Sequence, residues 1–572
     1  MQIRNKGIAA SNGVAIAKVY KLIEIPTNIF RTKVASVEDE LKKLYDAIDL
    51  ASKEVMNIRD LTSKNIGKEE ASIFDAHLFM LKDAVILKQV EELIHKLECN
   101  AAYAYQQVMN EVRDDITHSN NDYMIERLAD IKDITKRVVN KLNQQKTIDS
   151  FKNIKEPVII VAEDLTPSET VSFDNQWVKG IITTKGSKTS HSAILARTLN
   201  IPAVVGIPSL NYLHDGDLVI VDGTKGIIIV NPTETVREEY LAIQNDYYKR
   251  TELWNLYKNK PTYTKDLHKI DLGANIGAPN DVSNALLEGA EGVGLYRTEF
   301  LYMQSLSMPK EEEQYLVYKD VLSKMKDQKV VIRTLDVGGD KNLLYLPVKD
   351  ELNPFLGYRA LRLSLAQKDV FKVQLRALLK ASPYGNLHIM FPMVSTLDEL
   401  REAKALLKEC EEELRVENIK VASYKIGIMI EVPAAALFAK TFAKEVDFFS
   451  IGTNDLIQYL FAADRMNQNV SYLYQPYHPV VLNTIKNIIE AAHSENIWVG
   501  VCGEMGGDPK SALLLAGLGI DELSMNAHSI LEIRYLLNQF TIDELKTFSN
   551  KTLELETNDE VYHYIKQFIK GI

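Results

Sequence analysis

The sequence predicts a multidomain α/β protein, in which an α/β domain interrupted by a helical bundle precedes a (β/α)8 barrel. Three observations carry this prediction. The chain has 572 residues, too many for a single hydrophobic core. A proline-free, charged stretch from about Ser36 to Leu142 has apolar residues at helical spacing, and strand-like runs lie on both sides of it. From residue 268 onward, eight strand-like runs alternate with amphipathic helical patterns.

The composition is that of an ordinary globular protein, with 46% hydrophobic and 25% charged residues. No apolar run approaches the length of a membrane span, so no membrane insertion is expected. The net charge of −11 argues against a general nucleic-acid binder and would suit a basic protein partner. Cys99, Cys410 and Cys502 are too few and too scattered for a disulfide or zinc framework, which favours a reducing, cytoplasmic location.

The α/β domain is expected over residues 1–20 plus 147–231. Gly7–Ala10 and Val14–Ala17 are predicted to pair as a strand hairpin around the Asn12-Gly13 turn, which also interrupts a faint signal-peptide pattern. The later strand-like runs are Val158–Val161, Gly180–Thr183, Ala203–Val205, Leu218–Val221 and Ile227–Val230. Thr166-Pro167-Ser168-Glu169 has the spacing of a helix capping box.

Residues 21–146 are expected to form the inserted helical bundle. Leu41, Leu44, Ile48, Val55 and Ile58 recur on one helical face. Polar breaks near Gly67, Asn100 and Ser119-Asn120-Asn121 divide the stretch into about four helices. After the α/β domain, a charged helical pattern predicts a helical linker over 232–261.

Residues 262–572 are predicted to form the barrel, of the TIM type. The strand-like runs are Lys269–Ala274, Gly292–Tyr296, Val330–Thr334, Leu387–Phe391, Ile426–Ile430, Phe448–Gly452, Trp498–Val501 and Glu522–Met525. A doubly wound open sheet is the alternative. In a barrel, functional side chains gather at the carboxyl ends of the strands.

Polar residues do follow these strands where they end. They are Arg297-Thr298-Glu299, Arg333-Thr334-Leu335-Asp336, Glu431, Asn454-Asp455 with Arg465 shortly after, and Cys502-Gly503-Glu504. Glu431 and Asp455 are hard oxygen ligands of the kind that Mg²⁺ takes. The three arginines suit a small, multiply anionic substrate, since guanidinium matches carboxylate and phosphate geometry. For Cys502 alone, a buried core thiol is the more common role.

His191 follows the N-cap residue types Thr189 and Ser190 where a helical pattern begins. A helix N-terminus attracts phosphate and disfavours a protonated imidazole, so a neutral ring there could attack phosphorus. A capped helix with a solvent-facing histidine is the alternative. Gly292–Arg297 lacks the third glycine of a dinucleotide fingerprint and Gly186–Thr189 lacks the P-loop pattern, so no ATP site is expected.

Taken together, these motifs resemble enzyme I of the bacterial phosphoenolpyruvate:sugar phosphotransferase system. The resemblance covers essentially the whole chain and rests on the segments 165–170, 189–191, 201–206, 295–301, 336–341, 353–357, 427–431, 452–456 and 502–504. The histidine motif and the barrel signature are shared with pyruvate phosphate dikinase and phosphoenolpyruvate synthase. Those relatives carry a nucleotide-binding domain ahead of the histidine domain, where this chain has strands and the helical insertion.

The resemblance implies a role for each site residue. His191 would accept the phosphoryl group through Nε2, in a swivelling phosphohistidine domain. Arg297, Arg333, Asn454 and Arg465 would bind phosphoenolpyruvate, with Asp455 beside them. Glu431 and Asp455 would ligate Mg²⁺, and Cys502 would protonate the methylene carbon of the enolate.

The resemblance also implies partners. The helical insertion would dock the histidine-containing phosphocarrier protein HPr, and the barrel would form a homodimer. His77, Leu78, Phe79 and Leu81 could form an apolar docking patch or a buried helix seam. The phosphoryl group would pass from phosphoenolpyruvate to His191 and then to HPr, as the first step of sugar uptake.

His191 belongs to a different domain from the barrel, so its movement would need hinges near 145–150 and 231–262. Two alternatives stay open: a dikinase or synthase-type enzyme, and a catalytically idle regulator that senses phosphoenolpyruvate. An idle descendant should have lost His191, Cys502 or a metal carboxylate, and all of these are present.

Overall fold

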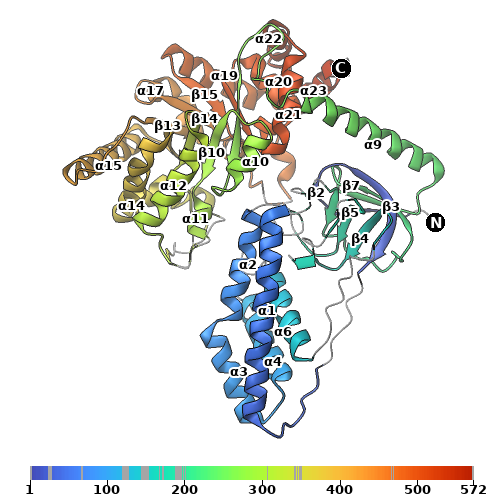
Figure 1. The fold of residues 1–572 in the computed structure, drawn as a ribbon. Coiled ribbons are helices and arrows are strands. Elements are labelled where there is room, and N and C mark those ends of the chain that lie inside the picture. The colour runs from blue at the N-terminus through green and yellow to red at the C-terminus, as the bar shows by residue number, and fades with distance from the viewer. Residues whose placement is uncertain are drawn as a thin grey trace. The chain divides into compact units, whose positions relative to one another are not determined.

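A computed structural model describes residues 3–22, 29–65, 68–118, 128–143, 154–166, 168–169, 173–174, 176–186, 193, 196, 199, 201–303, 305, 307–339, 343, 345–346, 351–465, 467 and 469–569. The chain divides into two compact units, Met1–Arg250 and Thr251–Ile572 (Figure 1). Within the described ranges, no helix is long and apolar enough to cross a membrane.

The first unit contains an eight-stranded sheet in the order β1-β8-β7-β3-β4-β5-β6-β2. Its strands are β1 (Ile3–Lys6), β2 (Ile8–Ser11), β3 (Val14–Lys21), β4 (Val158–Ala162), β5 (Val178–Thr183), β6 (Ala203–Val205), β7 (Leu218–Asp222) and β8 (Ile227–Val230). β3 pairs in parallel with β4, so residues before and after the helical insertion share one sheet.

The predicted hairpin over residues 7–17 is wrong. β2 pairs with β6, and β3 pairs with β4 and β7, so the strands on either side of Asn12-Gly13 do not pair with each other. Gly13 has a φ of +111°, and its N–H donates to Thr224 Oγ1 at 3.0 Å. Contacts distant in sequence, rather than a two-residue turn, therefore set the path of the chain here. Gly7 alone joins β1 and β2, the two ends of the strand order, so the sheet curls back toward itself.

Both faces of this sheet are covered, as continuous apolar runs predict. Along β4, Ile160 and Ala162 belong to one buried cluster and Ile159 and Val161 to another. Ala193 and Ala196, which follow His191 in the sequence, lie in the first cluster and are fully buried. These two alanines therefore pack against the sheet.

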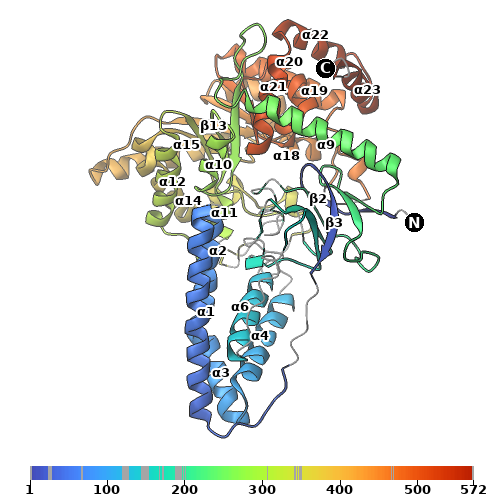
Figure 2. The ribbon, with the colours of Figure 1, turned by 45° about the vertical axis from the view of Figure 1, so that its right-hand side comes forward.

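The helical insertion contains α1 (Val37–Asn65), α2 (Lys68–Leu81), α3 (Ala84–Leu97), α4 (Ala101–His118) and α6 (Leu128–Leu142), which lie side by side (Figures 1 and 2). Leu44, Ile48 and Val55 lie in its core, as their spacing predicts. The break at Asp83 was not predicted. There the Asp83 carboxylate accepts the N–H groups of Val85 and Ile86 and caps α3.

The capping box at Thr166–Glu169 is confirmed. Glu169 Oε2 accepts the Thr166 N–H at 3.0 Å, and Thr166 Oγ1 accepts the Glu169 N–H at 3.3 Å. The same turn is tied to α6, since Ser168 Oγ donates to Asp133 at 2.5 Å and accepts from Arg137 at 2.8 Å. The linker contains a helix, α9 (Glu234–Asn255), within its predicted range.

The second unit is the predicted barrel. Its strands are β9 (Asp271–Ile276), β10 (Gly292–Arg297), β11 (Lys329–Arg333), β12 (Asn386–Phe391), β13 (Lys425–Ile430), β14 (Phe448–Ile451), β15 (Trp498–Val501) and β16 (Glu522–Met525). They pair in parallel and close in the order β10-β11-β12-β13-β14-β15-β16-β9, which excludes the open-sheet alternative.

Helices surround the barrel strands (Figure 1). They are α10 (Asp281–Leu287), α11 (Glu299–Met303), α12 (Glu311–Met325), α13 (Leu361–Ala366), α14 (Lys368–Ala381), α15 (Leu397–Val416), α16 (Pro433–Leu437), α17 (Ala439–Ala443), α18 (Thr453–Leu460), α19 (Pro479–Ser494), α20 (Pro509–Leu518), α21 (Ile530–Asn538), α22 (Ile542–Thr552) and α23 (Asn558–Ile569). Alternate strand residues pack beneath these helices or into a small interior cluster, as the two-residue period of a strand requires.

His388 of β12 packs in the barrel interior against the rings of Phe448 and Trp498. Burial lowers the pKa of His388 to about 4, and the charge of Lys329 adds to this effect. Because the folded pKa lies below the unfolded value, stability should fall as the pH decreases from about 6.5 to 4.

The native chain should lose free energy of unfolding between neutral pH and about pH 4.5. We expect this loss to be smaller by about 2 kcal/mol in His388→Phe, because phenylalanine cannot be protonated. Guanidinium unfolding of the native and variant chains at both pH values measures this difference. His563→Gln, at an exposed histidine, is the control and should retain the full loss. An equal acid-induced loss in all three chains would contradict the prediction.

Candidate active site at the carboxyl end of the barrel

The strand period explains why charged side chains gather at the carboxyl end of the barrel. Leu295, Val331 and Met429 lie in the interior cluster. Arg297, Arg333 and Glu431 follow them by two residues on β10, on β11 and at the end of β13, so they occupy the same face of each strand. Cys502, immediately after β15, is itself part of the interior cluster.

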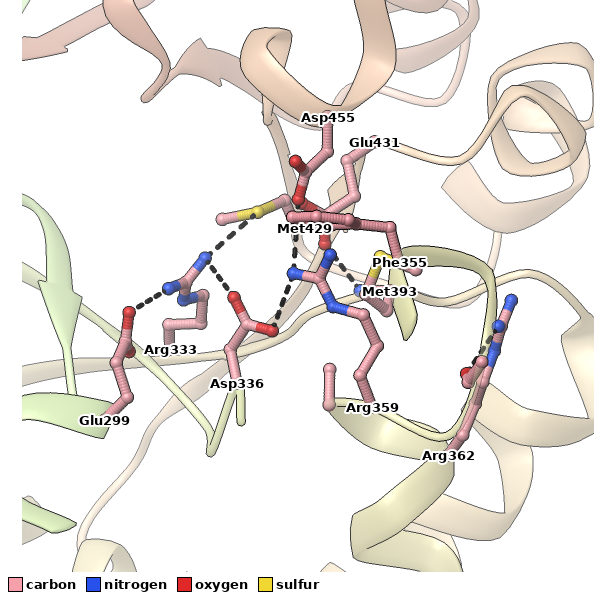
Figure 3. Close-up of polar contacts among 12 residues, drawn as sticks. Glu299, Arg333, Asp336, Phe355, Arg359, Arg362, Met393, Met429, Glu431 and Asp455 are labelled. Carbon is pink, nitrogen blue, oxygen red and sulfur yellow. Dashed lines mark hydrogen bonds and ion pairs between the residues drawn. The ribbon is translucent and has the colours of Figure 1, made fainter. Parts of the chain in front are cut away.

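A chain of alternating charges crosses this end of the barrel (Figure 3). Arg333 lies between Glu299 and Asp336, with nitrogen–oxygen distances of 2.5 and 3.0 Å. Arg359 lies between Asp336 and Asp455, at 3.0 and 3.3 Å. All five side chains are buried. Buried charges are tolerated only when they are paired, so removal of one member should be costly.

Both of these arginines stay protonated. Burial opposes the charged form of each guanidinium. At Arg333 the negative charges of Asp336 and Glu299 outweigh burial, and at Arg359 those of Asp336 and Asp455 do so. The pKa of each guanidinium therefore rises above its ordinary value. The site therefore keeps two fixed positive charges at any physiological pH.

Arg297 differs from these two arginines because its guanidinium makes no ion pair or hydrogen bond with the described part of the chain. Burial lowers the pKa of Arg297, and the nearby positive charge of Arg333 lowers it further. A guanidinium held in this way beside another cation is completed by an anionic ligand.

Glu431 and Asp455 form the acidic part of the site. Glu431 Oε1 accepts the Met393 N–H at 2.6 Å, whereas the buried Oδ1 of Asp455 accepts no hydrogen bond from the residues that the structure describes. The guanidinium of Arg465 lies 3.7 Å from that oxygen. Burial, followed by the negative charge of Asp455, raises the pKa of Glu431 well above its usual value. Two neighbouring carboxylates, one of them with an oxygen that accepts no hydrogen bond, fit a cation that takes oxygen ligands.

Two glycines allow the chain to pack closely around Glu431 and Thr453. A Cβ atom at Gly452 would lie 3.0 Å from Oε2 of Glu431, and one at Gly503 would lie 1.9 Å from Oγ1 of Thr453. In the described part of the chain, no group of three or more His, Cys, Asp or Glu residues could hold a metal ion. A metal bound here would therefore complete its coordination with substrate or water.

Asn454 and Cys502 are the neutral polar groups of the site. Asn454 Oδ1 accepts the Glu504 N–H at 3.0 Å, which orients the amide nitrogen for donation elsewhere. Cys502 is buried, and burial raises the pKa of its thiol to about 11, although Ser450 and Arg333 act in the opposite direction. At neutral pH the thiol is protonated, so it suits proton donation better than nucleophilic attack.

The structure brings together the predicted residues Arg297, Arg333, Glu431, Asn454, Asp455, Arg465 and Cys502 at one end of the barrel. The predicted phosphoryl acceptor, His191, lies outside the described residues. Arg359 was missed because it lies in the loop before α13, well beyond the end of β11. Its signal in the sequence was the preceding 353–357 motif.

Comparison with known proteins places this site in a class. Three family profiles match the chain: "PEP-utilising enzyme, N-terminal" over residues 6–127, "PEP-utilising enzyme, mobile domain" over 154–226 and "PEP-utilising enzyme, PEP-binding domain" over 251–542. The last contains every described site residue. The fold and the site thus define a PEP-utilising enzyme.

Full-length relatives narrow this class. The phosphoenolpyruvate-protein phosphotransferase of Staphylococcus carnosus (strain TM300) is 46% identical over 568 residues, covering 99% of each chain. That of Bacillus subtilis (strain 168) is 47% identical over 567 residues, with the same coverage. A solution structure of Enzyme I (nEIt) is 36% identical and covers 43% of this chain and 99% of its own, with a TM-score of 0.37. The chain belongs to the phosphoenolpyruvate-protein phosphotransferase family.

Proposed function

We propose that this chain transfers the phosphoryl group of phosphoenolpyruvate to its own His191 and then to a histidine of the phosphocarrier protein HPr, releasing pyruvate. This is the first step of sugar uptake by the phosphotransferase system. Family membership supports the proposal. The observation that carries it is the combination of an unpaired arginine, Arg297, and a protonated thiol, Cys502, at one barrel end.

The positive groups of the site suit phosphoenolpyruvate, which carries a carboxylate and a phosphate. Arg297, Arg333 and Arg465 would bind these groups through paired N–H donors. The Asn454 amide would add a neutral donor, since its oxygen is already occupied by the Glu504 N–H. Arg465 is the most accessible of the ion-paired arginines here, with 29% of its side chain exposed.

Glu431 and Asp455 would hold Mg²⁺, with Asp455 also next to the substrate. Asp455 Oδ1, which accepts no hydrogen bond from the described residues, and the mutual repulsion of the two carboxylates support this assignment. When bound, Mg²⁺ supplies positive charge that neutralises phosphoryl oxygens during transfer. Two carboxylates leave most of its coordination to water and substrate, as Mg²⁺ prefers.

The proposed transfer balances as follows. A nitrogen–phosphorus bond forms at His191 while the bond between phosphorus and the bridging oxygen of phosphoenolpyruvate breaks. That oxygen keeps the electron pair, which leaves an enolate. Its methylene carbon takes the proton of Cys502, giving pyruvate, and the thiolate regains a proton from water. Protonation to the keto form makes the transfer favourable.

His191 and the barrel site belong to different units, so the proposal requires a hinge. Arg534 narrows its position, because its guanidinium donates to the carbonyls of Tyr257 and Lys258 at 3.2 and 3.1 Å and to Thr262 Oγ1 at 2.9 Å. Residues from 257 onward are thus fastened to the barrel. The hinge expected over 231–262 is therefore assigned to 231–256. The other expected hinge, 145–150, lies outside the described residues.

The partner assignments are also proposals. Within the expected HPr patch, His77 and Leu81 are buried in the bundle, whereas Phe79 is 81% exposed, so the buried-seam alternative holds for the first two. For the homodimer, exposed Leu437 and Phe438 lie next to α19, which carries exposed Val480. Apolar side chains exposed on neighbouring elements support an interface there.

Incubation with labelled phosphoenolpyruvate and Mg²⁺ tests the reaction. We expect acid-labile, base-stable label on the native chain and none on His191→Ala, because phosphohistidine is hydrolysed in acid. His214→Ala, at an exposed histidine of the same unit, is the matched control and should be labelled as fully as the native chain. Label on His191→Ala, or a requirement for a nucleotide, would contradict the proposal.

A further inference from the structure

A buried hydrogen-bond network lies directly behind the two strand ends that carry Arg297 and Arg333. Thr298, next to Arg297, donates from Oγ1 to the Arg333 carbonyl at 2.8 Å. The side chain of Gln374, on α14, donates from Nε2 to Thr298 Oγ1 at 3.2 Å. Its Oε1 accepts the N–H of Leu335 at 2.9 Å. One amide therefore bonds to both strand ends.

The network is fully enclosed by protein. Thr298, Gln374 and Leu335 are 0%, 1% and 2% exposed. If the amide were removed, no water could easily replace it, and the Leu335 N–H would lose its partner. The two strand ends would then have to move to find new partners.

Gln374 stands out on its own helix. Its neighbours on the buried face of α14 are apolar, among them Phe371, Leu375 and Leu378. Packing against the barrel is thus provided without it. The network continues outward, since Gln374 Nε2 also donates to Tyr318 OH at 3.2 Å and Tyr318 OH donates to Gln314 Oε1 at 3.0 Å. Both of these residues are on α12.

We infer that Gln374 is a positioning residue for phosphoenolpyruvate binding, because it holds the backbone segments of Arg297 and Arg333 in register. The inference rests on the proposed function. The Arg333 side chain has its own ion pairs, but the Arg297 side chain has none with the described residues. The direction of Arg297 therefore depends on the backbone that Thr298 and Gln374 hold. Two guanidinium groups bind a small anion tightly together only when the distance between them is held within a fraction of an ångström.

The experiment measures exchange of label between pyruvate and phosphoenolpyruvate by the full chain with Mg²⁺, which needs no phosphocarrier. We expect Gln374→Met to raise the KM for phosphoenolpyruvate by about tenfold and to change kcat by less than about threefold, as loss of binding predicts. Gln374→Glu keeps the acceptor for the Leu335 N–H and loses the donor to Thr298. Its KM should therefore lie between that of the native chain and that of Gln374→Met.

Gln314→Met is the matched control. Gln314 is equally buried and accepts from Tyr302 and Tyr318, but among the described residues it makes no hydrogen bond with either strand end. Its KM should stay within about twofold of the native value even though its thermal stability falls. Thr298→Val breaks the same hydrogen-bond chain at Thr298, because valine has no hydroxyl to bond with Gln374 and the Arg333 carbonyl. It should raise the KM as Gln374→Met does, whereas Thr298→Ser, which keeps the hydroxyl, should restore it.

The double variant Gln374→Met/Thr298→Val should have a KM close to that of the single variants, because both break one chain of bonds. An unchanged KM in Gln374→Met and Thr298→Val, with exchange by the native chain intact, would overturn this inference alone. So would an equal rise in Gln314→Met, which would indicate general loosening. Absence of exchange in the native chain would instead overturn the proposed function, and this inference with it.

Discussion

Replacement of Cys502 by alanine is expected to lower turnover by about 10²–10⁴-fold, the usual contribution of a positioned general acid. The thiol lies in the barrel interior beside the charged groups, and its raised pKa keeps it protonated. Binding of phosphoenolpyruvate should change little, since alanine leaves Arg297 and Arg333 in place. Rapid-quench measurement of pyruvate release gives the turnover, and calorimetric titration gives the affinity.

The pH dependence provides a second measurement on the same residue. The folded pKa of about 11 lies above the ordinary value of 9.0, so the neutral thiol favours the folded state. This contribution is complete below about pH 9 and is lost as the pH rises through about 11. The difference in ultraviolet thiolate absorbance between the native chain and Cys502→Ala should therefore develop mainly above pH 10 or so.

Cys410→Ala is the matched control for these measurements. Cys410 is a buried thiol on α15 with its own pKa raised by burial. Its thiol donates to the Lys372 carbonyl, and it makes no hydrogen bond with a described site residue. Its replacement should lower stability through a small cavity and leave turnover unchanged. If Cys410→Ala lost as much turnover as Cys502→Ala, or if the Cys502 thiolate appeared near pH 7, proton donation by Cys502 would be ruled out.

Much of the barrel was predictable because parallel strands are buried on both faces and appear as short apolar runs. Trp498–Val501 and Glu522–Met525 have the predicted bounds. The site followed from the same pattern, because Arg297 and Glu431 end such runs on the inner face. The local sequence pattern was enough to predict these positions, since each side chain is placed by its own strand.

The errors have the opposite cause. The Asn12-Gly13 hairpin failed because β2 and β3 find partners more than a hundred residues away, which a local turn signal does not contain. Arg359 escaped notice because it reaches Asp336 and Asp455 from a loop, not from a strand end. Gln374 is one polar residue in an amphipathic helix, and only the packing of α14 shows that it faces inward.

Replacement of Arg359 by methionine should cost about 3–5 kcal/mol of barrel stability, the typical result of removing one partner from a buried ion pair. Asp336 would keep Arg333, but among the described residues Asp455 would be left with Arg465 as its ion-pair partner, at 3.7 Å. We also expect added Mg²⁺ to stabilise this variant more than the native chain, because a bound cation would replace part of the lost charge. Guanidinium unfolding with and without Mg²⁺ measures both effects.

Arg362→Met tests whether the cost comes from charge pairing in particular. Arg362 lies three residues after Arg359, in α13. Figure 3 shows the Arg362 side chain away from the carboxylates. It donates to the carbonyls of Leu356 and Gly357 and to Ser395 Oγ, all neutral groups. Its loss should cost about 1–2 kcal/mol and show no Mg²⁺-dependent recovery. Equal losses in the two variants, or equal stabilisation by Mg²⁺, would mean that Arg359 only braces the loop and does not balance the acidic groups of the site.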